Sequence, residues 1–172
     1  SMATDKNGTM RMLLNNEFVF QYGPLDQGWW PDGLYTAPTD EALKFDIIKT
    51  KEMGFNMIRK HIKVEPARWY YECDRQGVLV WQDMPSGDLG NKWEMRVGDY
   101  GGTDKDRTPE SEASYKKEWN SIMETLHNFP SIVVWVPFNE AWGQFKTKEI
   151  TEWTQKKAWS GQPFPRDYAV EY

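Results

Sequence analysis

The chain has 172 residues, enough to bury the core of one domain, and a net charge of −5. Because it has no surplus of basic residues to neutralise phosphates, we expect no nucleic-acid partner. No apolar run approaches the ~20 residues of a membrane span and no signal segment starts the chain. We therefore expect a soluble protein without a membrane partner, in a compartment that the sequence leaves open.

The first part of the chain predicts little regular structure. Residues 1–12 are polar and are expected to form a loose leader. Residues 17–22 favour a strand, which Gly23 and Pro24 end. A loop rich in Gly, Pro and Trp follows at 25–38, and loops of this length in compact domains are usually functional.

Strands and helices alternate beyond this loop. The helices carry apolar residues at three- and four-residue spacing with capping residues at their ends, and the strands are short apolar runs. The expected order is a helix at 39–54, a strand at 55–59, a helix at 66–77, a strand at 78–81, a helix over 115–126, a strand at Ile132–Val136 and a helix at 145–157. The polar, Gly-rich segment at 84–109 and the end at 159–172 show no clear periodicity of apolar residues, and we interpret the end as an irregular tail.

The alternation predicts an α/β fold with a parallel sheet and right-handed crossovers, built from four strand–helix units. In such folds the functional groups collect at the carboxyl ends of the strands. The residues expected at those ends are Tyr22, Arg59, His61, Asp83, Asn139 and Glu140. The two longest loops also follow strands, which favours a functional site on this rim.

Asn139 and Glu140 are the most suggestive of these residues. They come just after an apolar strand that Pro137 ends, and Phe138 and Trp142 flank them. A carboxyl group held among aromatic rings is poorly solvated, which raises its pKa and suits it to act as a general acid near neutral pH. The alternative is that an asparagine and a glutamate are simply good residues at the start of a helix.

Other candidate residues also have a structural interpretation. His61 could contact a substrate or serve as a hydrogen-bonding structural residue, and Asp83 could support a substrate site or hold neighbouring rim groups. Trp142 offers a flat face on which a sugar ring could stack, or it packs within the protein. The only other histidine, His127, ends a helix, so we expect no histidine-based metal site. No compact carboxylate-rich loop favours Mg²⁺ or Ca²⁺, and we expect no cofactor.

Three blocks of sequence resemble a known family. The blocks are residues 54–61, residues 69–83, and residues 129–135 with the Asn139–Glu140 pair. In this order they resemble the catalytic domain of glycoside hydrolase family two, which contains β-galactosidases, β-glucuronidases and β-mannosidases. The resemblance extends from about residue 14 to residue 153.

The resemblance implies an eight-fold barrel, of which the four units here form a partial TIM barrel, and a retaining mechanism on a β-glycoside substrate. Glu140 matches the general acid/base, and Asn139 matches the residue that binds the sugar 2-hydroxyl group. Arg59, His61 and Asp83 match rim positions near the substrate. The spacing from Arg59 to His61 is one residue tighter than in the best-known galactosidases.

The resemblance also predicts that one component is missing. Retaining chemistry needs a second carboxylate that forms the glycosyl-enzyme, and the family places this glutamate near its seventh strand. The only glutamate after the last predicted helix is Glu171, in the tail at 159–172. We therefore expect residues 1–12 to be a leader and residues 13–158 to be the N-terminal half of a catalytic barrel, inactive without its nucleophile. The alternative is a non-catalytic half-barrel that binds carbohydrate weakly at most and forms a homodimer through its open sheet edges.

Overall fold

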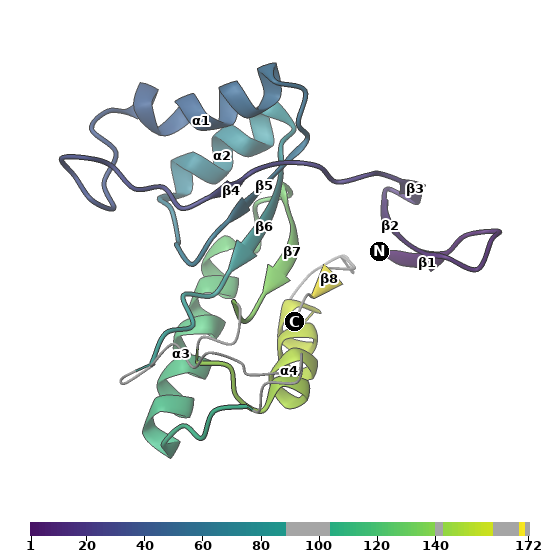
Figure 1. Cartoon of the computed structure of the whole chain (residues 1–172), viewed down its shortest axis with the longest axis vertical. Coiled ribbons are helices and arrows are strands. Elements are labelled where there is room, and N and C mark those ends of the chain that lie inside the picture. The colour runs from purple at the N-terminus through teal and green to yellow at the C-terminus, as the bar shows by residue number, and fades with distance from the viewer. Residues whose placement is uncertain (89–103, 140–142, 160–168, 171–172) are drawn as a thin grey trace, which may run out of the picture.

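A computed structural model of the chain describes residues 1–88, 104–139, 143–159 and 169–170 (Figure 1). The described strands form two sheets, one antiparallel with the order β1-β2-β3 and one parallel with the order β4-β5-β6-β7-β8. The elements are β1 (Met2–Thr4), β2 (Met10–Leu14), β3 (Glu17–Phe18), β4 (Leu25–Asp26), α1 (Asp40–Glu52), β5 (Met57–Lys60), α2 (Ala67–Gln76), β6 (Leu79–Asp83), α3 (Pro109–Leu126), β7 (Ile132–Val136), α4 (Thr147–Trp159) and β8 (Ala169–Val170).

The parallel sheet confirms the predicted α/β fold. One helix follows each of the strands β4 to β7, so the chain completes four strand–helix units before β8. Consecutive strands are neighbours in the sheet, which is the connectivity of part of a TIM barrel. In Figure 1, α1 lies beside α2, and α3 lies on the same side of the molecule as α4.

The first strand of this sheet is not the one that the sequence predicted. Residues 17–22 were expected to begin the parallel sheet, but Glu17–Phe18 forms β3, which pairs antiparallel with β2. Leu25–Asp26 takes the place beside β5 instead. The carbonyl of Tyr22 accepts the backbone N–H of Asn56, the residue before β5, so Tyr22 lies at the amino end of the sheet and not at the predicted rim.

Both ends of the chain contain more regular structure than predicted. The leader at 1–12 was expected to be loose, but it contains β1 and most of β2, which pair with each other. Asn15 and Asn16 then form a two-residue turn to β3, both with positive φ (51° and 67°), as a type I′ hairpin requires. The tail at 159–172 was expected to be irregular, but β8 within it pairs with β7.

The hydrophobic core lies between the parallel sheet and its helices. The predicted inward face of α2 is confirmed, because Trp69, Tyr70 and Cys73 are fully buried. Trp119 of α3 meets Trp135 of β7 edge to face, with ring centroids 5.5 Å apart. This packing fixes the outer face of each strand, so the alternate residues point to the inner face. No helix in the described part of the chain is long and apolar enough to cross a membrane.

Candidate active site

Three side chains meet where β5, β6 and β7 end. Arg59 of β5 forms a two-pronged ion pair with Asp83 of β6, from Nε to Oδ1 at 2.9 Å and from Nη2 to Oδ2 at 3.1 Å. The same Nη2 donates to Oδ1 of Asn139, just after β7, at 3.1 Å. Parallel strands bring their carboxyl ends to one edge, and this edge therefore assembles residues 80 positions apart in the chain.

Asp83 is the least accessible member of this group. Its side chain is fully buried, whereas that of Arg59 is 24% exposed. Burial raises the pKa of Asp83, and the hydrogen bonds from Arg59 oppose that rise. Both oxygens of the Asp83 carboxylate already accept hydrogen bonds from within the protein, which favours the interpretation that Asp83 holds its neighbours over direct contact with a substrate.

The residue after His61 adds a third hydrogen bond to this carboxylate. The backbone N–H of Ile62 donates to Oδ2 of Asp83 at 3.2 Å. Ile62 has a φ of +45°, in the left-handed region that a β-branched residue rarely adopts. Such strain persists only where the surrounding contacts impose it, and it is common beside functional sites.

His61 is buried beside this group and has a partner of its own. Its Nδ1 lies 3.2 Å from Nε2 of Gln27, which follows β4. The structure therefore places His61 among the rim residues and gives it a structural hydrogen bond as well.

A buried charge network lies behind the rim, on the helix-facing side of β5. Lys60 donates to Asp26 at 2.6 Å and to Glu65 at 2.9 Å. Lys63 contacts the same oxygen of Glu65 at 2.8 Å and donates to the carbonyl of Gly28 at 2.6 Å. These bonds tie the connection after β5, which carries His61, to the loop after β4.

The sequence analysis missed this network, although the strand contained a signal for it. In β5, Ile58 faces the helices, and Lys60 is two residues later and so lies on the same face. A lysine at a core-facing position needs buried partners. The Nζ atom of Lys60 also lies 4.4 Å from the centroid of the Trp69 ring, an additional contact for the buried cation.

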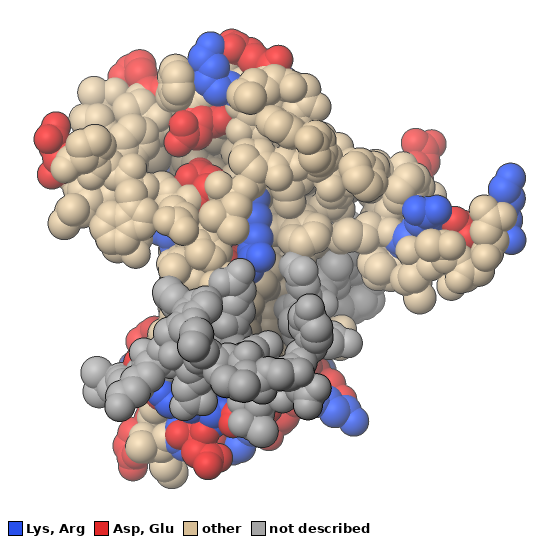
Figure 2. Space-filling model, in the orientation of Figure 1, with Lys and Arg blue, Asp and Glu red and all other residues tan. Residues whose placement is uncertain are grey.

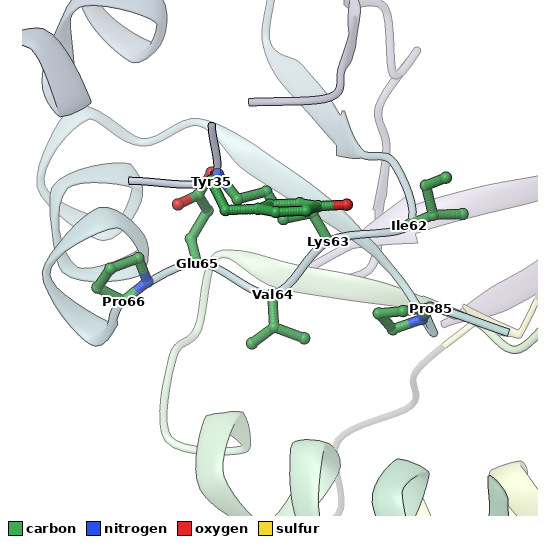
Figure 3. A pocket seen from close by; sticks show the side chains of 7 residues that line it. All are labelled: Tyr35, Ile62, Lys63, Val64, Glu65, Pro66 and Pro85. Carbon is green, nitrogen blue, oxygen red and sulfur yellow. The ribbon is translucent and has the colours of Figure 1, made fainter. Parts of the chain in front are cut away.

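A shallow pocket of about 410 Å³ lies next to the network (Figure 3). The ring of Tyr35 lies over Lys63, whose Nζ is 5.2 Å from the ring centroid. The pocket is lined by Tyr35, Ile62, Lys63, Val64, Glu65, Pro66 and Pro85. Since Ile62 also binds Asp83, the pocket adjoins the rim.

On the face shown in Figure 2, the described basic and acidic side chains are interspersed.

Two predicted site residues, Glu140 and Trp142, lie outside the described residues. Asn139, immediately before them, is buried, with 3% of its surface exposed, and is fixed by Arg59. In the described ranges, no three His, Cys, Asp or Glu side chains are grouped so that they could hold a metal ion. Besides the buried Asp83 carboxylate, the described rim assembles a guanidinium, an amide and an imidazole, which are suited to hydrogen-bonding a polyhydroxylated ligand.

Comparison with known proteins identifies related enzymes. Residues 36–160 match the family model described as glycosyl hydrolases family 2, TIM barrel domain. Over 111 residues the chain is 31% identical to β-mannosidase B from Emericella nidulans and 26% identical to a putative β-glucuronidase from Formosa agariphila. Each alignment covers 63% of this chain but only 12% and 11% of those relatives, so the chain spans a small part of their length.

Solved structures share the fold at lower identity. A family 2 β-galacturonidase from Eisenbergiella tayi, bound to galacturonate, matches 98% of this chain with a TM-score of 0.69 and 22% identity. β-Glucuronidase 3 from Bacteroides uniformis matches 99% of it with a TM-score of 0.64 and 20% identity. The chain covers 28% and 20% of these two proteins, respectively. Because the family model matches most of the chain, the protein belongs to glycosyl hydrolase family 2, of which it contains part of the TIM barrel domain.

Proposed function

We propose that this chain supplies the acid/base side of a retaining β-glycosidase site. Glu140 protonates the glycosidic oxygen as the bond to the leaving group breaks, and it then removes a proton from the water that hydrolyses the glycosyl-enzyme. Asn139 binds the sugar hydroxyl group at position 2. The observation that carries this proposal is the position of Asn139, buried at the carboxyl end of β7, bound to Arg59 and directly before Glu140.

Family membership also supports a substrate class for the proposal. The names of the relatives refer to β-mannosides and β-glucuronides, which supports a β-linked glycoside as the substrate of the complete enzyme. In this proposal His61 and Arg59 complete the polar wall around the sugar, and Trp142 contributes an aromatic face. The 172 residues provide one of the two carboxylates, and further strands of the barrel provide the nucleophile.

An assay with a panel of aryl β-glycosides tests the proposal. We expect the complete enzyme to hydrolyse at least one of them. On glycosides of weakly acidic phenols, its Glu140→Gln variant should lose about two to four orders of magnitude in rate, the usual contribution of acid/base catalysis. Glu149→Gln is the matched control, because Glu149 is an exposed residue of α4 that pairs with Lys116. Unchanged turnover in Glu140→Gln would remove Glu140 from the mechanism. Turnover by the 172-residue chain alone would show that it holds both carboxylates.

A second function applies to the 172 residues by themselves. Within the described residues, β4 and β8 are the edges of the parallel sheet, and each pairs with one neighbour only. Open edges favour pairing between chains, so a non-catalytic, self-associating half-barrel is the alternative. Light scattering decides this point, because a monodisperse monomer at high concentration is incompatible with edge pairing.

A further inference from the structure

The side-chain amide of Asn139 can face its neighbours in two ways, and Arg59 permits only one of them. A guanidinium has only donors, so the group that it contacts must be an acceptor. Nη2 of Arg59 lies 3.1 Å from Oδ1 of Asn139. The oxygen of the amide is therefore turned towards Arg59, and its NH₂ group is turned away. Held in this way, Asn139 has hydrogen-bond donors and no acceptor on the side of the amide that faces away from Arg59.

Arg59 is in turn fixed by Asp83. The two carboxylate oxygens take Nε and Nη2, the planar geometry that fixes a guanidinium most firmly. The N–H of Ile62 holds the same carboxylate from a strained backbone position. Asp83 contacts Arg59, and Arg59 in turn contacts Asn139, so any effect of Asp83 on the Asn139 amide passes through Arg59.

We propose that Asp83 is a positioning residue, which acts through Arg59 to fix Asn139 as a hydrogen-bond donor to the sugar oxygen at position 2. This inference rests on the proposed function. In this inference Asp83 determines the orientation of the Asn139 amide, and Arg59 connects the two residues. When the carboxylate is lost, the guanidinium can rotate, and the amide can turn its oxygen towards the sugar, where it no longer donates.

Two substrates separate this role from a merely structural one. The complete enzyme and its Asp83→Asn variant are compared on an aryl β-glycoside and on the matching 2-deoxy glycoside. We expect the variant to lose about tenfold or more in kcat/KM on the hydroxylated substrate, in line with the loss of one charge-assisted hydrogen bond. On the 2-deoxy substrate it should lose little, because the interaction that Asp83 supports is already absent. An equal loss on both substrates would overturn the inference.

Matched variants complete the design. Glu72→Gln also converts a buried, arginine-paired carboxylate to an amide, but on α2, and it should leave the ratio between the two substrates unchanged. Arg59→Lys should reproduce the Asp83→Asn pattern, because a lysine cannot bridge both partners in a plane. If the parent enzyme shows no preference for the hydroxylated substrate, or if Glu140→Gln retains full activity, the proposed function fails instead.

A readout without activity tests the first step directly. In ¹⁵N-labelled 172-residue chain, the Nε–H of Arg59 should exchange slowly with water, and the Asp83→Asn change should accelerate that exchange. Exchange that stays slow in the variant would mean that Asp83 does not fix the guanidinium, which contradicts the inference whatever the kinetics show.

Discussion

Replacing Lys60 by methionine tests whether the buried charge network holds this rim together. The side chain of Lys60 is 1% exposed and neutralises Asp26 and Glu65, whose side chains are 14% and 2% exposed. Methionine fills much of the same volume but carries no charge, so the two carboxylates lose their shared cation. Removing one partner of a buried ion pair typically costs about 3–5 kcal/mol.

The structure places the expected loss at the lower end of this range. Lys63 stays within 2.8 Å of Glu65, so one carboxylate keeps a cation, while Asp26 has enough exposure to recover some hydration. We therefore expect Lys60→Met to lower the free energy of unfolding by about 3 kcal/mol, a large part of the roughly 5–15 kcal/mol that stabilises a typical domain. The measurement is urea unfolding of the 172-residue chain, monitored by tryptophan fluorescence. The variants can be compared if the dependence of the unfolding free energy on urea concentration, the m-value, is the same for each.

Lys49→Met is the matched control. Lys49 pairs with Glu52 on the surface of α1, where the two side chains are 48% and 56% exposed. Exposed pairs contribute at most about 1 kcal/mol, so the same substitution should have little effect there. Adding Asp26→Asn to Lys60→Met should restore part of the stability, because it removes one unpaired buried charge. If the two lysine variants were equally stable, the argument from burial would be refuted.

Three further measurements follow from the same structure. Cys73 is fully buried, and burial raises the pKa of its thiol. It should therefore react with a thiol reagent only as fast as the chain unfolds, and fast reaction in the native chain would contradict the packing of α2. Ile62→Asn should raise the free energy of unfolding by about 1 kcal/mol, since asparagine tolerates a positive φ better than isoleucine does. A destabilised variant would show that the contacts of the Ile62 side chain stabilise the fold by more than the strained backbone destabilises it. Because burial raises the pKa of Asp83, the folded chain holds this proton more tightly than the unfolded chain, and ionisation costs stability as the pH rises from about 3.8 through the folded pKa. The stability of Asp83→Asn relative to the parent should therefore increase over that window in urea titrations, and a decrease would mean that pairing with Arg59 outweighs burial.

The sequence predicted the elements that have a strong local pattern. The apolar face of α3, with Tyr115, Trp119, Met123 and Leu126, is buried as the three- and four-residue spacing indicated. β7 runs from Ile132 to Val136, as its continuous apolar run suggested. These elements bury one face or both, and burial imposes the period from which they were predicted.

The sequence was less informative where pairing, not burial, creates the structure. β4 and β8 have two residues each and are strands only because a neighbour pairs with them, which no local run reveals. The hairpin of β2 and β3 did have a signal, since asparagine tolerates the positive φ that both central residues of a type I′ turn need, and Asn15–Asn16 directly follows Leu14. Taking residues 17–22 as the first parallel strand also placed Tyr22 at the wrong end of the sheet.

The candidate site was predicted in part for the same reason. Arg59, Asp83 and Asn139 could be expected at one rim, because each lies at or just beyond the end of an apolar strand. Their mutual bonds could not be predicted, since they depend on the register of β5, β6 and β7 and on the strained turn at Ile62. The family resemblance that the sequence blocks carried is confirmed by the match over residues 36–160.

The dependence of kcat/KM on the acidity of the leaving phenol tests the central claim most directly. An acidic phenol leaves without a proton, whereas a weakly acidic one needs the general acid. If Glu140 is that acid, Glu140→Gln in the complete enzyme should hydrolyse dinitrophenyl glycosides far better than phenyl glycosides, with a dependence much steeper than that of the parent. Equal losses for every leaving group would contradict the assignment of Glu140 as the acid/base.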